Sequence, residues 1–433
     1  MRIAVIGSGI SGLAAAWALN RRYDVTVYEA DQRLGGHANT VEIPDPAGAI
    51  PVDTGFIVYN EANYPNLVQL FHHLDVPTEP SEMSFSVSRD RGGFEYRARA
   101  AGLFAQPSNL GRPGHLRMIR DVIRFTREAP MLLRDGTFET TGELLDRMDM
   151  SSEFRRDFLL PMLACIWSSS LETMLDYPAE SMVRFLDNHG LLNVLKRPRW
   201  RSVSGGSREY VSRISSSFAG GVRLGTPVER IERTSDEVAV HDSRGGIGRF
   251  DQIVVATHAD TALEMLGRGA TEAEREVLSA FRYQRNRAVL HRDPTLMPKR
   301  RRAWSSWNYL AAPGDDGTEQ VSLSYWMNRL QNLETERPVI VTLNPGREPR
   351  DIEREFTYDH PQYDQLTVAA QGLLPSLQGS RRTWFCGSYH GSGFHEDGLR
   401  AGLAVAADLG SPAPWWSTST PAERTGRAPI GTR

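Results

Sequence analysis

Apolar and polar positions in the first thirty residues follow the pattern of an alternating α/β protein. Ile3–Ile6 is an unbroken apolar run, typical of a strand buried on both faces of a parallel sheet. An alanine-rich helical stretch, Leu13–Asn20, comes next, and Val25–Tyr28 has the pattern of a second buried strand. We therefore predict a Rossmann-like βαβ unit and an α/β fold class.

The turn between the first strand and the helix carries a glycine pattern that fits a phosphate group. Gly7 permits the tight turn, Gly9 lets a diphosphate approach the backbone, and Gly12 lets the helix pack closely on the strand. Free N–H groups at the helix end would face the phosphates. Glu29, at the end of the second strand, can accept hydrogen bonds from ribose hydroxyls. The residues expected to contact a dinucleotide here are Gly7, Ser8, Gly9, Ile10, Ser11, Gly12, Glu29 and Ala30.

Helical periodicity replaces this alternation from about residue 66 to residue 202. Arg117–Leu133 has the apolar stripe of an amphipathic helix, and Phe154–Cys165 is predicted as a helix that Pro161 kinks. A hairpin is predicted from Phe85–Ser88 and Phe94–Arg97. Later strands are predicted at Arg287–His291, Val321–Trp326 and Val339–Leu343.

These changes of pattern predict two interleaved domains and a tail. A nucleotide-binding domain is expected from residues 1–65, 203–260 and 378–410. A discontinuous α+β substrate domain with a helical roof is expected from residues 66–202 and 261–377. The tail, 411–433, is rich in Pro, Ser and Thr and is predicted to be disordered.

Composition narrows the classes of partner. The net charge of −3 over 433 residues gives no reason to expect nucleic acid. No apolar run is long enough to span a membrane, and the first strand leaves no room for a signal peptide, so a cytoplasmic location is expected. Cys165 and Cys386 lie far apart, which argues against a metal site or a disulfide framework. Lys196 and Lys299 are the two lysines among 50 basic residues.

A second glycine pair follows the ribose-binding strand. The segment Gly35–Thr40 resembles the Gly-Gly-Arg-x-x-Ser/Thr motif of the flavin-containing amine oxidase and phytoene desaturase superfamily, with His37 in place of arginine. The resemblance implies noncovalent FAD and a Rossmann-like FAD-binding domain of the glutathione-reductase and amine-oxidase type. In that superfamily this stretch lies along the FAD diphosphate, so Gly35, Gly36, His37 and Ala38 are implied contacts.

Four later segments extend the resemblance. Val52–Ile57 resembles the turn beside the flavin ring, Val228 fits the valine whose backbone holds the adenine, and Asp251–Thr257 resembles the following parallel strand. Gly387–Leu399 resembles the segment that leads into a helix whose positive end points at the flavin. The implied FAD contacts are Gly55, Phe56, Ile57, Val228, Ala256, Thr257, Gly387, Ser388, Phe394, His395, Glu396 and Leu399.

A closer resemblance, from Met1 to about Leu409, is to a bacterial branch of FAD proteins. It is carried by Val52–Asn60, Met83–Ser88, Trp304–Tyr309 and Gly393–Gly398. Its members are similar to the amino-terminal domain of plant cyclopropane fatty acid synthases and to polyunsaturated fatty acid isomerases. The resemblance implies an FAD-dependent oxidoreductase that acts by hydride transfer on a fatty acyl chain, as a desaturase or an isomerase. The candidate catalytic residues are His395, Glu396 and Tyr325.

Two other functions stay open. Amine oxidases of the superfamily often carry a lysine near flavin N5, whereas the strand predicted here offers Asn286, Arg287 and His291. A noncatalytic flavoprotein partner of a lipid methyltransferase or cyclopropane synthase is the other alternative. Lys196–Arg201 and Lys299–Arg302 are interpreted as solvated loops, with peripheral contact to anionic lipid at the inner membrane surface as the alternative.

Overall fold

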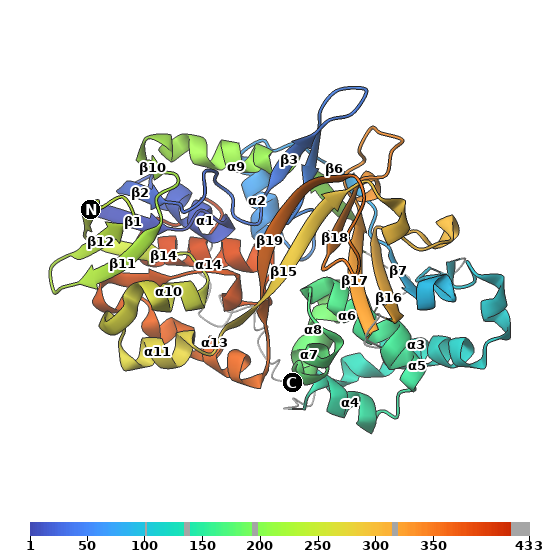
Figure 1. Ribbon diagram of the computed structural model, residues 1–433. Helices are drawn as coiled ribbons and strands as arrows, with labels where there is room; N and C mark the ends of the chain where they lie inside the picture. The colour runs from blue at the N-terminus through green and yellow to red at the C-terminus, as the bar shows by residue number, and fades with distance from the viewer. Residues whose placement is uncertain (100–101, 134–138, 193–197, 314–318, 417–433) are drawn as a thin grey trace.

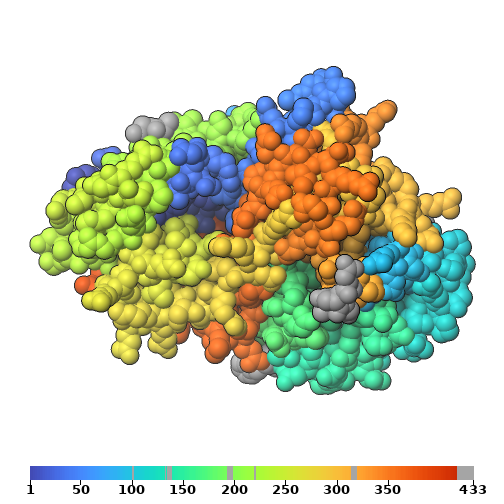
Figure 2. Space-filling view, viewed as in Figure 1, coloured from blue at the N-terminus to red at the C-terminus, as the bar shows by residue number. Residues whose placement is uncertain are grey.

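The computed structural model describes residues 1–99, 102–133, 139–192, 198–313 and 319–416. Two sheets lie side by side in it, each covered by its own helices (Figure 1). In the space-filling view, the orange segment around β19 (Ile352–Gln362) lies between the yellow-green half and the teal helices (Figure 2). This strand therefore belongs to the junction of the two halves.

The first half is built on a parallel sheet of five strands. Its spatial order is β10-β2-β1-β14-β20, and every neighbouring pair is parallel. Val5 pairs with Val27 on one side and with Val254 on the other, which places β1 inside the sheet. The predicted Rossmann-like α/β fold is confirmed. The strands are β1 (Arg2–Ile6), β2 (Asp24–Tyr28), β10 (Val222–Arg223), β14 (Gln252–Val255) and β20 (Thr383–Phe385).

Two helices pack against each other on one face of this sheet. All ten residues of α1 (Ile10–Leu19) are buried, and α14 (His395–Asp408) crosses it through glycines. A Cβ atom on Gly402 would lie 2.1 Å from the Ser11 carbonyl oxygen, so no larger residue fits between the helices. The opposite face is covered by a second layer: the sheet β11 (Val228–Arg233), β12 (Val238–Asp242), β13 (Ile247–Phe250) and the helices α10 (Ala259–Leu266), α11 (Glu272–Leu278), α13 (Gln365–Leu377).

The second half is built on a seven-stranded mixed sheet. Its order is β19-β15-β18-β17-β16-β7-β8, antiparallel except for the parallel pair β7 and β16. The predicted hairpin and the later strands are confirmed, although several are longer than expected. The remaining members are β7 (Phe85–Arg89), β8 (Phe94–Arg97), β15 (Arg282–His291), β16 (Trp307–Pro313), β17 (Glu319–Trp326) and β18 (Ile340–Leu343).

Helices cluster at one end of this sheet, as the predicted roof. Pro161 stands in the first turn of α6, directly after a π-helical turn, Arg155–Leu159, and the residues that flank this turn keep helical backbone angles. Proline has no N–H for the Asp157 carbonyl, which accepts from the Tyr96 hydroxyl at 2.6 Å instead. The irregularity predicted at Pro161 therefore takes the form of a π-helical turn. The helices are α3 (Pro113–Leu132), α4 (Thr141–Arg147), α5 (Ser152–Phe154), α6 (Leu160–Trp167), α7 (Leu171–Asp176) and α8 (Ala179–Asn188).

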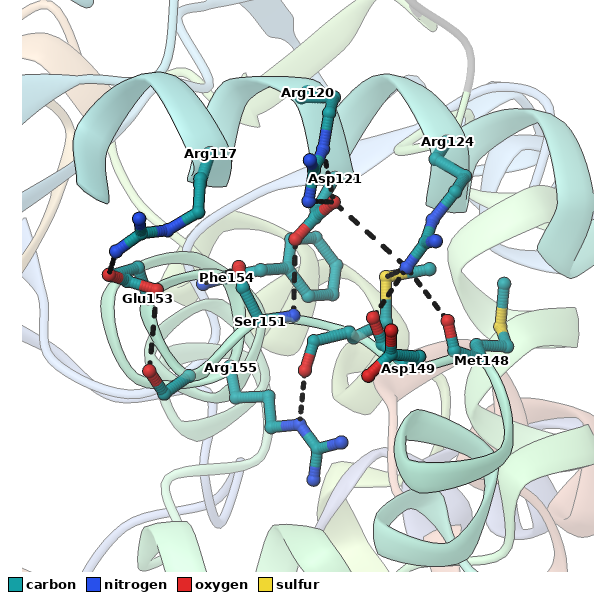
Figure 3. A network of polar contacts seen from close by, with 12 residues as sticks. Arg117, Arg120, Asp121, Arg124, Met148, Asp149, Ser151, Glu153, Phe154 and Arg155 are labelled. Atoms are coloured by element: carbon teal, nitrogen blue, oxygen red, sulfur yellow. Dashed lines mark hydrogen bonds and ion pairs between the residues drawn. The ribbon is translucent and has the colours of Figure 1, made fainter. Parts of the chain in front are cut away.

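The long helix α3 is fixed to the loop before α5 by its polar side chains (Figure 3). Asp121 is fully buried and accepts a hydrogen bond from the Ser151 backbone N–H at 3.1 Å. Arg124 donates to the carbonyl oxygens of Met148 and Asp149, both at 2.7 Å. Because these donors and acceptors satisfy one another, α3 and the loop before α5 are held together within the helical cluster.

Two small sheets and two helices lie in the segments that connect the halves. Strands β3 (Thr40–Ile43) and β4 (Ile50–Asp53) form a hairpin, and β9 (Trp200–Val203) lies between β5 (Tyr59–Asn60) and β6 (Thr78–Ser81). Two further helices, α2 (Pro65–His73) and α9 (Arg208–Ser215), follow β5 and β9 along the chain.

The predicted disorder of residues 411–433 is wrong for the first part of that segment. The Ser411 hydroxyl donates to the Ala18 carbonyl at 2.7 Å, and the Trp415 ring stacks on Trp17 with 5.6 Å between centroids. Burial of an aromatic pair stabilises this end of the chain against α1. Residues 417–433 lie outside the described part of the chain.

A buried ion pair ties β11 of the small antiparallel sheet to helix α11, and its loss should destabilise the first half. Arg233 and Glu274 are 2% and 1% exposed. Arg233→Met would leave the Glu274 carboxylate without its partner, so we expect a loss of about 3–5 kcal/mol in the free energy of unfolding by urea. The matched control is Arg230→Met, whose pair with Glu232 is about half exposed and should cost less than about 1 kcal/mol. Equal losses would show that burial of the pair does not set its contribution.

Candidate functional site

The glycine loop after β1 has two packed positions and one open position. A Cβ atom on Gly12 would lie 1.9 Å from the Gly7 carbonyl oxygen, and Gly7 itself has φ +95° against the Ala256 carbonyl. A Cβ atom on Gly9 would meet nothing within 4 Å. Close packing therefore requires glycine at positions 7 and 12. The open space beside Gly9 is where a diphosphate fits.

Two helix N-termini meet beside this space. Gly9 precedes α1 and no side chain caps that helix, so the first-turn N–H groups are free to bind an anion. The first turn of α14 lies next to it, because a Cβ atom on Gly398 would be 2.9 Å from side-chain atoms of both Ile10 and Ser11. Two helix N-termini therefore border the same volume, and the first turn of α14 carries the carboxylates of Glu396 and Asp397, whereas that of α1 carries none.

Glu29 is fixed at the end of β2 with part of its carboxylate available. One oxygen accepts from the Ser8 N–H at 2.9 Å and the other from the Asp31 N–H at 2.8 Å. The Glu29 carbonyl accepts from the Thr226 N–H at 2.8 Å, which brings the segment leading to Val228 alongside. A carboxylate has about four acceptor positions, so Glu29 can still accept from a ribose.

The second glycine pair lies directly on the glycine loop. The Gly35 N–H donates to the Ser8 carbonyl at 3.0 Å, and a Cβ atom on Gly36 would lie 3.1 Å from the Gly9 Cα atom. Arg33 fixes this turn by donating to the carbonyls of Gly36 and Ala38 at 2.8 and 3.2 Å. The segment that carries His37 thus borders the same opening.

The predicted flavin-side turn is joined both to this segment and to the seven-stranded sheet. The Phe56 N–H donates to the His37 carbonyl at 2.8 Å. Tyr358 of β19 contacts the Thr54 hydroxyl at 2.7 Å and receives a hydrogen bond from the Asn39 amide at 2.9 Å. Gly55, Phe56 and the neighbouring Ile57 are therefore placed at the junction of the two halves.

His395 lies at the start of α14 as a neutral ring. It stacks on Phe56 with 3.8 Å between centroids, and its Nε2 atom is 2.7 Å from the Tyr210 hydroxyl. Burial lowers the pKa of His395 to about 3. The side chain can accept or donate a hydrogen bond near neutral pH, but it does not carry a positive charge there.

The Glu396 carboxylate is committed to protein contacts, which corrects its expected catalytic role, and its FAD contact stays a prediction. One carboxylate oxygen accepts from the Asn66 backbone N–H at 3.0 Å and from its side-chain amide at 2.7 Å. The other oxygen accepts from the Leu67 N–H at 3.0 Å. The carboxylate therefore satisfies the N-terminus of α2 and joins that helix to α14.

Tyr325 is also corrected, from a catalytic candidate to a core residue. Its hydroxyl donates to the Cys165 carbonyl of α6 at 3.3 Å, and its ring meets the edge of Trp307. The side chain is 8% exposed, and burial raises its pKa. It packs the seven-stranded sheet against the roof.

The other implied contacts fall at three places around the opening. Ala256 and Thr257 contact Gly7, so they border the glycine loop. Phe394 stacks on Phe185 of α8 at 4.7 Å, which turns its ring toward the roof. The side chain of Leu399 is fully buried in the core, so only its backbone is available to a cofactor. Gly387 and Ser388 lie between β20 and α14.

A cluster of histidines beside this opening was missed by sequence reasoning. The His37 ring lies 6.2 Å from His258 and 5.8 Å from His360. The His360 Nδ1 atom accepts from the Asn286 amide at 2.8 Å. The register of β15 against β19 pairs residues some 75 positions apart, and no local sequence signal reveals such a pairing.

Comparison with known families agrees with the site geometry. The family model described as flavin containing amine oxidoreductase matches residues 10–410. The chain belongs to this family. Its cofactor is FAD, and the open position at Gly9, the two helix ends and Glu29 fit that cofactor.

Curated relatives match only part of the chain. Protoporphyrinogen oxidase 2 of Arabidopsis thaliana is 56% identical over 41 residues, which are 9% of this chain and 8% of that protein. The candidate flavin-containing monoamine oxidase AofH of Mycobacterium tuberculosis is 25% identical over 258 residues, 56% of this chain and 54% of AofH. The matches thus span at most about half the length of these relatives.

Solved structures share the fold across nearly the whole chain. A cyclohexylamine oxidase from Brevibacterium oxydans has a TM-score of 0.65 at 19% identity, covering 94% of this chain and 98% of that one. A fatty acid isomerase from P. acnes that produces CLA has the same TM-score at 15% identity, with 94% and 97% covered. At these identities the likeness establishes the fold and not the substrate.

Basic residues of the Lys299–Arg302 run are used within the fold. Arg300 donates to the Gly92 carbonyl at 2.9 Å and pairs with Glu95, and Arg301 lies over the ring of Trp304 at 3.7 Å. These contacts attach the run to the fold, while Lys299, Arg301 and Arg302 are exposed, as expected for a solvated loop. Of the 196–201 run, residues 196 and 197 lie outside the described residues.

Among the described residues, no helix is both long and apolar enough to cross a bilayer.

Glu29 should control FAD affinity. Removing its carboxylate in Glu29→Ala takes away the ribose acceptor and frees the Ser8 N–H, so we expect FAD affinity to fall about ten- to a hundredfold. The measurement is the dissociation constant from flavin fluorescence. Asp31→Ala is the matched control, because that side chain is 65% exposed and only weakly paired. A similar loss in both variants would contradict the assignment.

Glu396 should affect stability rather than chemistry. Burial raises the pKa of this carboxyl to about 7. The folded-state pKa is thus above the unfolded one, so the group's stabilising contribution is lost as pH rises through 7. In Glu396→Gln we expect this decline between pH 5 and pH 8 to flatten, with the flavin spectrum retained and about 1–3 kcal/mol lost at pH 5. The control is Glu209→Gln, whose carboxyl is more exposed. If Glu396→Gln kept its full stability but lost turnover, Glu396 would have to be a catalytic residue.

Proposed function

We propose that the protein is an FAD-dependent oxidoreductase that acts on a fatty acyl chain bearing a free carboxylate. The observation that carries this proposal is a surface pocket of about 510 Å³ beside the roof. Three arginines line it, together with apolar and aromatic side chains. Among its lining residues are Met83, Arg99, His189, Leu191, Arg199, Trp200 and Arg201.

A row of aromatic rings leads from this pocket toward the start of α14. Trp200 stacks on His189, His189 on Phe185 at 3.8 Å, and Phe185 on Phe394 at 4.7 Å. Phe394 directly precedes His395, which packs on the flavin-side turn. Phe185 is buried between its neighbours, so the row is a packed apolar wall that starts at the pocket. Apolar and aromatic side chains at the pocket suit a hydrocarbon chain better than a short polar substrate.

The charges at the pocket favour an anion over an amine. Arg99 and Arg199 are exposed, and Arg201 is partly exposed beside them. Glu82 is the acidic lining residue, and it is paired with Arg97 and Arg329. A cationic amine would therefore be repelled, whereas a carboxylate would be attracted. This supports acyl redox chemistry or isomerisation over amine oxidation, although amine oxidases share the fold.

When bound, FAD supplies a ring that can accept and return a hydride. The chain would contribute two helix ends beside the cofactor and His395, a neutral hydrogen-bonding group near its ring. The described lysine, Lys299, contacts Glu95 through its backbone N–H, far along the sheet from this place. Desaturation and double-bond isomerisation both fit these residues. A noncatalytic partner of a lipid-modifying enzyme is the alternative from another class, and peripheral membrane contact remains part of the proposal.

The test compares one chain length with three head groups. A polyunsaturated fatty acid, its methyl ester and the corresponding alkylamine are added anaerobically to the holoprotein. We expect flavin bleaching or a shifted double bond with the acid. Arg99 and Arg199, the two exposed arginines of the pocket, should attract the carboxylate. The double variant Arg99→Gln/Arg199→Gln should therefore raise the KM for the acid about tenfold or more and leave the KM for the ester unchanged.

Arg337→Gln, an exposed arginine outside the pocket, is the control. Turnover of the amine alone would overturn the proposal in favour of amine oxidation. No spectral or product change with any of the three would favour the noncatalytic partner.

A further inference from the structure

Two half-buried histidines border the glycine loop from two separate segments. His37 follows Gly36, which lies against Gly9, and His258 follows the Ala256 and Thr257 pair that contacts Gly7. Their ring centroids are 6.2 Å apart. Both imidazoles therefore lie next to the opening where the diphosphate of FAD fits.

Their ring nitrogens differ from those of the neighbouring histidines in having no hydrogen bond among the described residues. His360 Nδ1 is held by the Asn286 amide at 2.8 Å, and His395 Nε2 by the Tyr210 hydroxyl at 2.7 Å. Neither His37 nor His258 is fully buried, and none of their nitrogens is sealed off without a partner. Their hydrogen-bonding groups are thus open to a ligand.

The groups around the pair keep both rings neutral in the absence of an anion. Burial lowers the pKa of His37 well below its usual value, and the other histidines and Arg33 lower it further. Burial also lowers the pKa of His258, against the opposing effect of Asp260 and Asp359. Two neutral tyrosine rings also contact the pair. Tyr283 stacks on His258 with 4.2 Å between centroids, and the Tyr358 ring lies 5.0 Å from that of His37.

At the position where the superfamily motif has arginine, this turn carries His37, whose neutral ring brings no fixed charge. Arg33, the arginine of this turn, commits its guanidinium to the carbonyls of Leu34, Gly36 and Ala38. A metal ion is no substitute, because no group of three His, Cys, Asp or Glu side chains in the described residues is arranged to hold one. Besides the free backbone N–H groups at the start of α1, the imidazoles are therefore the side-chain partners that this turn offers to a diphosphate.

We propose that His37 and His258 together bind the diphosphate of FAD and that the pair takes up one proton from solvent when FAD binds. The proton adds to a ring nitrogen of one imidazole, which becomes imidazolium, while the other ring stays neutral and donates a hydrogen bond. His360 is excluded as the proton acceptor at Nδ1, since that atom already accepts from Asn286. No bond of the cofactor changes. The inference depends on FAD binding and not on the acyl substrate.

Proton uptake makes cofactor retention depend on pH. A site that gains one proton on binding binds more tightly as pH falls, by at most about tenfold per pH unit. The wild-type holoprotein should therefore release FAD several-fold more readily at pH 8 than at pH 6. The measurement is the recovery of flavin fluorescence after dilution of the holoprotein.

Two variants separate charge from simple damage. His37→Arg supplies a permanent cation, so the release of FAD should no longer vary with pH. At pH 8 this variant should release FAD more slowly than the wild type. His37→Gln/His258→Gln should also lose the pH dependence, but with faster release throughout. His72→Gln, an exposed histidine on α2, is the control and should keep the wild-type profile.

A spectroscopic measurement keeps the inference testable if the double variant does not fold. In holoprotein labelled with ¹⁵N-histidine, we expect one imidazolium signal at pH 7 that His37→Arg removes. Release that does not vary with pH in wild type, or neutral rings throughout pH 6–8, would overturn the inference. Because no acyl substrate is used, failure here leaves the proposed function untouched, and the reverse also holds.

Discussion

The contact between α1 and α14 is the constraint on which the rest of the structure depends. Gly398 and Gly402 leave no side chain between the two helices. Their first turns are therefore brought together at the carboxyl ends of the strands of the parallel sheet. A single larger residue at either position would separate them. Because helix ends act on charge only within about one turn, this close approach decides whether one or two positive ends reach the cofactor.

The seven-stranded sheet depends on the same arrangement. Tyr358 holds the loop that carries Asn39 and Thr54, and Glu396 holds α2 through its N-terminal N–H groups. The Tyr358 contact joins the second half to a segment that already touches the glycine loop, and the Glu396 contact holds α2 in the core of the first half. The pocket beside the roof is thus positioned relative to the cofactor by hydrogen bonds and not by a flexible linker. Under the proposed function, a substrate that enters there would meet a site whose geometry is set beforehand.

Local sequence patterns predicted the parts of the fold that short-range physics determines. The apolar run Ile3–Ile6, the glycine spacing after it and the hairpin at Phe85–Arg97 each depend on neighbours in the chain. The same reasoning failed for Glu396 and Tyr325, because an ionisable side chain looks catalytic until its partners are known. Asn66 and Cys165, which contact these two side chains, lie 330 and 160 positions away. The disorder expected for 411–416 failed similarly, since Trp415 finds Trp17 only in the folded chain.

The order of segments along the chain has a consequence for folding. Strand β20 and helix α14 complete the cofactor site, yet they follow more than 370 residues that include all of β1 and α1. During synthesis, the glycine loop and its helix must wait for their last partners, with α1 unable to bury its apolar surface against α14. Pairings between such distant segments form slowly and leave apolar surface open to wrong contacts. The glycines that bring the two helices together thus also set how late in synthesis FAD can first be held.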